Sequence, residues 1–144
     1  YTDRDGEVIF KKYSPMGEMG AVSAELAEAL ARTAGMSCAI CDRDAVIAAA
    51  GGAKKDILER SISSELEQLM ERRECYERGV DEQPEVLISS QDGCAVVAAA
   101  PIITDGDVSG CVAFVSEKED EKADEVLLKL CQSAAQFLSK RIAV

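Results

Sequence analysis

The sequence predicts a single α+β domain, in which a twisted antiparallel sheet carries the first and last helices packed on one face. Three observations lead to this fold class. The chain has 144 residues, a length that suits one domain. A helix-period pattern of apolar residues stands near each end. The apolar runs between them are separated by Asp-Gly turn signals, which join neighbouring antiparallel strands.

The first 15 residues are expected to hold a short strand at 7–13. This strand stops at Ser14-Pro15, since Pro15 lacks a backbone N–H and restricts the residue before it. No earlier segment is available to pair with it. We therefore expect residues 1–13 to be the end of another unit, and residues 14–144 to form the domain itself.

A first helix is expected over residues 16–34, with Gly35 as its C-cap. Its apolar positions alternate by three and four residues, which places them along one stripe of the helix. The members of this stripe are Met19, Val22, Leu26, Ala29 and Thr33. The same spacing suits the seam between two packed helices.

Strands and helices alternate through the middle of the chain. The expected elements are strands at 36–43 and 45–50, a short helix at 54–60, and a longer helix from 61–64 to about 76. Ser64 and Glu67 have the spacing of a capping box at the start of the longer helix.

Three strands and a closing helix are expected in the last part, at 86–90, 94–103, 108–116 and 120–142. Gln91-Asp92-Gly93 and Asp105-Gly106 are hairpin signals. Gly110 marks a bulge or a close approach of another backbone. The closing helix has a broad apolar face, made of Ala123, Val126, Leu127, Leu130, Cys131, Ala134, Phe137, Leu138 and, at its end, Arg141.

Composition excludes several classes of function. The net charge of −11 opposes binding to nucleic acid or to anionic membranes. No apolar run is long enough to span a membrane, so we expect a cytoplasmic protein. The chain has no His, which removes the commonest general base and metal ligand. We expect no catalytic residue, metal or cofactor.

Six cysteines invite other interpretations. Cys38 and Cys41 have redox or zinc spacing, but on a strand they face opposite sides, and a zinc site needs four ligands. Cys94 and Cys111 lie on strands joined by a hairpin and could be neighbours. Cys75 stands among arginines, where a reactive thiolate is favoured. Core packing is the preferred interpretation for most of the six.

One segment has the character of an anion cradle. Gly51, Gly52, Lys54 and Lys55 lie between a strand and a helix start, where backbone N–H groups and ammonium groups can meet a phosphate or carboxylate. The spacing is not that of a P-loop. A strand-to-helix turn with solvated lysines is the competing interpretation. The acidic run at 117–125 is similarly either a solvated helix start or a docking patch.

Several stretches together resemble the stage V sporulation protein T family: DRDGEVIFKKYSP at 3–15, CDRDAVIAAAGGAKKDILERSIS at 41–63, PIITDGDVSG at 101–110 and the final AAQFLSKRIAV. The resemblance covers nearly the whole chain and is weakest across 75–92. It implies that residues 1–13 end an AbrB-type DNA-binding domain and that a GAF domain follows. It also implies an oligomer, a dimer or tetramer, with GAF helices packed between chains.

These implications lead to an expected function. The chain would be a non-enzymatic sensing and oligomerisation domain of a sporulation regulator, binding an unknown small-molecule effector and reaching DNA only through the other domain. The alternative is a purely structural oligomerisation module without a ligand. Some GAF proteins are methionine sulfoxide reductases, for which Cys75 would be the candidate thiol. The expected interface residues are Met19, Val22, Leu26, Leu30, Leu127, Leu130 and Phe137.

Overall fold

The computed structural model describes residues 16, 19–79, 86–89, 93–118 and 124–142. The expected strand at 7–13, the boundary near residue 14 and the Gln91-Asp92 turn lie outside these residues. The elements are α1 (Gly20–Ala34), β1 (Ser37–Asp42), β2 (Val46–Ala50), α2 (Lys54–Ile57), α3 (Ser64–Glu71), β3 (Tyr76–Glu77), β4 (Ala95–Thr104), β5 (Asp107–Ser116) and α4 (Glu125–Ile142).

The sheet has five strands in the order β2-β1-β5-β4-β3, and each neighbouring pair is antiparallel. The long β4–β5 hairpin turns at Asp105 and Gly106, which have φ angles of 52° and 84°. Two consecutive positive φ angles are those of a type I′ turn, whose twist matches that of the flanking strands. The antiparallel α+β prediction is confirmed.

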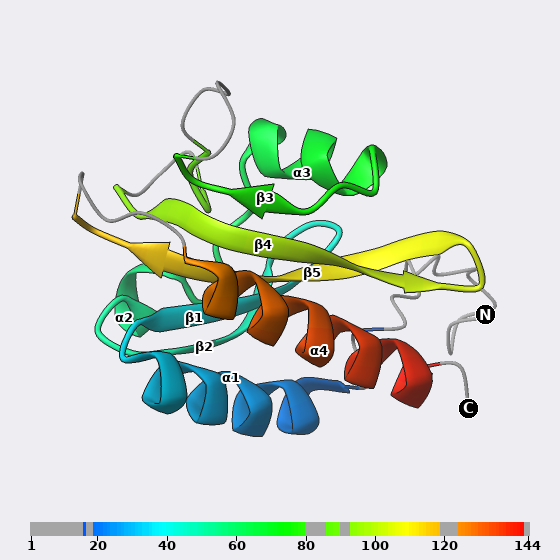
Figure 1. Ribbon diagram of the computed structural model, residues 1–144, viewed down its shortest axis with the longest axis horizontal. Coiled ribbons are helices and arrows are strands. Elements are labelled where there is room, and N and C mark those ends of the chain that lie inside the picture. Colours follow the sequence, from blue (N-terminus) through cyan, green and yellow to red (C-terminus); the bar gives the residue numbers. More distant parts are fainter. Residues whose placement is uncertain (1–15, 17–18, 80–85, 90–92, 119–123, 143–144) are drawn as a thin grey trace, which may run out of the picture.

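Helices cover both faces of the sheet, where the sequence had indicated one. As expected, α1 and α4 lie side by side on the same face (Figure 1), and they close a core that includes Phe114 and Leu138. The opposite face is covered by α2 and α3, with a second core that includes Leu66 and Ile88. A sheet that is apolar on both faces needs a cover on each.

Helix α1 ends as predicted at Gly35, which adopts the left-handed conformation with φ 68° and donates its N–H to the Ala31 carbonyl. Its buried face is different from the expected stripe. Ala29 and Thr33 are exposed, and the residues that are buried are Ser23, Ala27, Leu30 and Ala31. Three of these four residues are small, which lets the helix approach the alanine-rich strand β2 closely.

Helices α2 and α3 are shorter than predicted. Helix α2 ends at Ile57, since Leu58 is extended and Glu59 has a positive φ of 68°. Helix α3 stops at Glu71, and Tyr76 lies instead in the short strand β3. The cap of α3 is Ser63, one residue before the predicted Ser64. Its Oγ accepts a hydrogen bond from the Leu66 N–H at 3.1 Å.

The predicted strand at 86–90 is reduced, in the described residues, to an isolated bridge between Leu87 and Ala95. The Ile88 N–H donates to the Cys94 carbonyl, and the Val96 N–H donates to the Val86 carbonyl. Helix α4 begins at Glu125, where the Asp124 carboxylate accepts from the Leu127 N–H. None of the described helices has the length and apolar character needed to cross a membrane.

Candidate functional site

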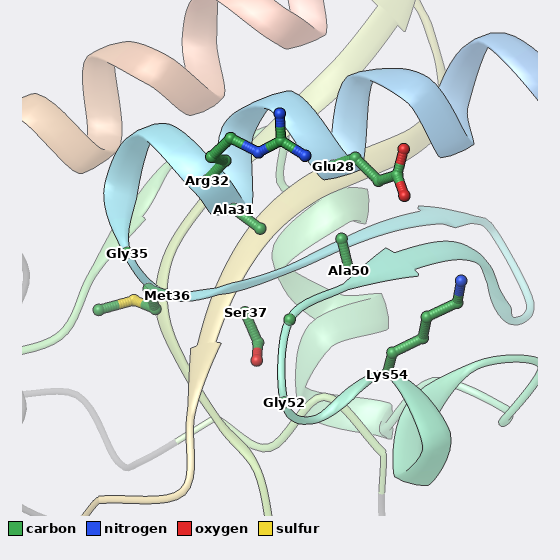
Figure 2. A pocket seen from close by; sticks show the side chains of 10 residues that line it. Glu28, Ala31, Arg32, Gly35, Met36, Ser37, Ala50, Gly52 and Lys54 are labelled. Atoms are coloured by element: carbon green, nitrogen blue, oxygen red, sulfur yellow. The ribbon is translucent and has the colours of Figure 1, made fainter.

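A pocket of about 510 Å³ opens where the end of α1 faces the end of β2 (Figure 2). It lies on the α1 side of the sheet. Its lining residues are Glu28, Ala31, Arg32, Gly35, Met36, Ser37, Ala50, Gly51, Gly52 and Lys54. Three of the four residues of the predicted anion cradle therefore line a pocket, while Lys55 is not among the lining residues.

The floor of the pocket depends on close backbone packing between β1 and the turn after β2. The Ser37 Oγ accepts a hydrogen bond from the Ala53 N–H at 3.0 Å. Gly51 has a φ of +99°, and a Cβ on it would lie 2.6 Å from the Ser37 Oγ. Only glycine fits such a position, both by conformation and by space. Gly51 thus brings the turn before α2 against the start of β1.

Charged side chains stand around the mouth of the pocket. Arg32 and Glu28 extend from α1, and Lys54 extends from the start of α2 on the other wall (Figure 2). All three residues are exposed. Two cations and one carboxylate give the mouth a net positive charge in a chain whose net charge is −11. Such a mouth is suited to an acidic group on a ligand.

Glu28 and Arg32 were not among the predicted site residues. They are four residues apart on one helix, which is the spacing of an exposed helical ion pair. Nothing local distinguishes them from any other solvated pair. Their contribution follows from the left-handed turn at Gly35, which folds β1 back beside the helix end.

The expected interface residues fall into two groups. Leu30 and Leu127 are buried within the protein's own core, at 7% and 6% exposure. Met19, Val22, Leu26 and Leu130 are partly buried against the same core. Phe137 is 46% exposed, and Val126, which belongs to the same helix, is 61% exposed. Among the described residues of α4, these two are the large apolar side chains open to a partner.

The buried cysteines pack in the cores. Cys38 and Cys41 lie in different cores on opposite faces of the sheet, as predicted. The neighbour of Cys111 is Cys41, directly across β1 and β5, and not Cys94, because Cys111 pairs with Pro101 in the β4–β5 register. Burial raises the pKa of Cys38 to about 12. A hydrogen bond with Cys111 and then burial raise the pKa of Cys41.

Cys75 is the exposed member of the six. The Gln132 Nε2 donates to its Sγ at 3.6 Å. Two of the nearby arginines have other partners. Arg72 pairs with Glu74 at 3.6 Å, and Arg73 donates to the Gly106 carbonyl at 3.0 and 2.9 Å. In the described part of the chain, no group of three or more Cys, Asp or Glu side chains is arranged to hold a metal ion.

Comparison with known protein families shows that residues 18–143 match the family described as "Stage V sporulation protein T C-terminal, transcription factor". The chain is also 38% identical to stage V sporulation protein T of Bacillus subtilis (strain 168) over 142 residues. That alignment spans 99% of this chain and 79% of the relative.

Similar solved structures contain GAF domains. One is the GAF domain of a phosphoenolpyruvate-protein phosphotransferase from Coxiella burnetii, with a TM-score of 0.64, 13% identity, and coverage of 87% of this chain and 82% of that one. Another is the cofactor-binding GAF domain of the nutrient sensor CodY from Clostridium difficile, with a TM-score of 0.59, 14% identity, and coverage of 88% and 92%. At these identities the likeness establishes the GAF fold alone.

Proposed function

The chain belongs to the family of stage V sporulation protein T C-terminal domains, which are transcription-factor domains, and from this premise we propose that it is the signal-sensing and oligomerisation part of a sporulation regulator. It performs no catalysis. It acts in the cytoplasm, and contact with DNA belongs to another domain of the regulator. Its effector is a small molecule with an acidic group.

The observation that carries the proposal is the pocket between α1 and the β2–α2 turn. Arg32 and Lys54 stand on its two walls, and a carboxylate or phosphate between them would form charge-assisted hydrogen bonds. The third charged residue, Glu28, can accept from a donor elsewhere on the ligand. The volume of about 510 Å³ suits a metabolite, since small-molecule pockets span about 300–1,000 Å³.

The position of the pocket gives a route from ligand to assembly. Its Glu28, Ala31 and Arg32 belong to α1, whereas Ser37 and Gly51 belong to the sheet side. A ligand that bridges the two would favour one placement of α1 on the sheet. The ligand changes the populations of two such placements of α1 only if it binds one of them more tightly than the other. Helix α1 contacts α4, so a shift would reach the surface that carries Phe137.

A thermal-shift screen tests the sensing proposal. The reduced protein is melted with a panel of metabolites that includes nucleotides, amino acids and organic acids. A ligand at 100 times its dissociation constant stabilises the folded protein by about 2.7 kcal/mol. We expect an acidic compound to raise the Tm of the wild type and of Lys55→Gln, which changes the neighbouring lysine outside the pocket, but not of Lys54→Gln.

Because both lysines are exposed, each variant should fold and melt as the wild type does without ligand. A compound that raises the Tm of Lys54→Gln and Lys55→Gln equally would show that the ligand does not bind at the α1 pocket. Silence across the panel would favour a second candidate function, a structural clamp without an effector. That candidate is favoured by the apolar cores that pack on both faces of the sheet.

A further inference from the structure

A second pocket, of about 480 Å³, lies between β4 and α4, away from the α1 pocket and sharing no residue with it. The chain segment after α3 closes one side. The lining residues are Arg73, Cys75, Ala100, Pro101, Ile103, Gln132, Ala135, Gln136, Ser139 and Lys140.

The pocket exists because the sheet edge is left uncovered there. Strand β3 pairs only with Ala98 and Ala99 of β4, so beyond this point the outer edge of β4 has no strand partner among the described residues. Pro101 has no N–H to offer along this edge, a typical place for proline in a sheet. The Ser139 Oγ donates to the Ile103 carbonyl at 2.5 Å. The exposed backbone is thereby blocked against a further strand, and a hollow remains.

The charge of this hollow is opposite to that of the protein. The described residues that line it include Arg73 and Lys140 and no Asp or Glu, although the chain carries 27 acidic residues against 16 basic ones. The Arg73 guanidinium is held in place by the Gly106 and Glu71 carbonyls. A guanidinium has five N–H groups, so these contacts position it without using all of its donors.

Neutral polar groups complete the lining. Gln132 and Gln136 lie one turn apart on α4 and contribute side-chain amides. Ala100 and Ala135 provide a small apolar floor between them. An amide can donate to an oxyanion or accept from a hydroxyl. Two cations, two amides and no acid form a set of donors for a small polyanion.

We propose that this pocket is a second ligand site, which binds a small molecule carrying carboxylate or phosphate groups independently of the α1 pocket. Lys140 supplies the charge that attracts the ligand, Arg73 a fixed guanidinium, and the two glutamines the remaining hydrogen bonds. The Cys75 thiol lies in the lining, and a bound molecule covers it.

Cys75 makes the proposal measurable, because the other five cysteines are buried. The rate of its alkylation by neutral iodoacetamide is followed by mass spectrometry, with citrate or pyrophosphate added and with sodium chloride of equal ionic strength as the reference. The two anions separate carboxylate from phosphate chemistry. At ten times the dissociation constant, a ligand that covers the thiol should slow labelling about tenfold by mass action.

Four variants assign the effect to a site. Lys140→Gln should lose the protection. Lys129→Gln should keep it, because Lys129 lies on the same helix and pairs with Glu125 outside the pocket. Lys54→Gln should also keep it, which separates this site from the one on α1. Gln136→Glu places a carboxylate in the lining and should repel the anion without removing a cation.

Saturable protection by either anion that depends on Lys140 supports the proposal and identifies the group bound. The proposal fails if neither anion slows labelling more than the matched salt does. It also fails if Lys140→Gln, folded as judged by its melt, is protected as well as the wild type. Neither failure would affect the α1 pocket, whose test uses Lys54.

Discussion

At the scale of single residues, glycines set the distances between neighbouring segments. Gly51 lets the turn after β2 approach Ser37 and so forms the floor of the α1 pocket. Gly110 lets β5 approach β1 at the centre of the sheet. A Cβ at this position would lie 1.9 Å from the Cys41 carbonyl oxygen and 3.1 Å from the Asp42 Cα. The sequence predicts either a bulge or a close approach at Gly110, and the structure shows the close approach.

Gly110→Ala should therefore destabilise the protein severely. The methyl group would meet backbone atoms, which cannot rotate away as a side chain does, and overpacking of a core already costs about 1–3 kcal/mol. We expect a loss of at least about 3 kcal/mol, measured by urea unfolding. The control is Gly20→Ala, since nothing lies within 4 Å of a Cβ at Gly20. Equal stability of the two variants would contradict the close approach.

At the scale of elements, the fold shows which features have local causes. The β4–β5 hairpin and the end of α1 were predicted because Asp105-Gly106 and Gly35 determine their own backbone conformations. The cap of α3 was placed one residue too late. The capping-box spacing with Glu67 favours Ser64 in the sequence. A distant segment favours Ser63 instead, because the Ser63 Oγ donates to the Leu87 carbonyl at 2.6 Å.

The two serines give a matched pair of variants. Ser63→Ala removes a hydrogen bond to the first turn of α3 and another to the Leu87 carbonyl, and it should cost about 1–2 kcal/mol of unfolding free energy. Ser64→Ala changes an exposed side chain and should cost about 0.5 kcal/mol or less. The denaturant midpoints of the two variants, compared with that of the wild type at a common m-value, measure both losses of unfolding free energy. A larger loss of stability in Ser64→Ala than in Ser63→Ala would show that Ser64 is the cap.

The difference between local features and contacts of distant segments also explains how much of the candidate site could be predicted from the sequence. Gly51, Gly52 and Lys54 are adjacent, so their composition alone indicated a cradle. Arg32 reaches it only through the turn at Gly35. Arg73 and Lys140 line one pocket only because the segment after α3 and the end of α4 both lie beside β4. Cys41 and Cys111 likewise become neighbours through a strand register. Contacts between segments far apart in the chain have no signature in a local pattern.

At the scale of the whole molecule, the three layers leave one helix surface only partly used. Val126 and Phe137 are eleven positions apart, so they lie within about 20° of each other around α4, and Leu130 stands between them. This apolar strip of Val126, Leu130 and Phe137 lies beside the buried face of α4, about 100° around the helix from its centre, and Leu130 itself packs partly against the core. A strip of this kind is a surface that a second copy of the chain can cover.

Phe137→Glu should abolish association while the fold persists, because the side chain is 46% exposed and leaves no large cavity. Sedimentation velocity over a range of protein concentrations measures the association, and the melt measures the fold. Gln136→Glu adds the same charge about 100° around the helix and should assemble as the wild type does. Leu127→Glu, at a residue 6% exposed, should instead unfold the protein. Unchanged assembly of a folded Phe137→Glu variant would show that copies of the chain meet through another surface, and the route proposed from the α1 pocket to this strip would then have no endpoint.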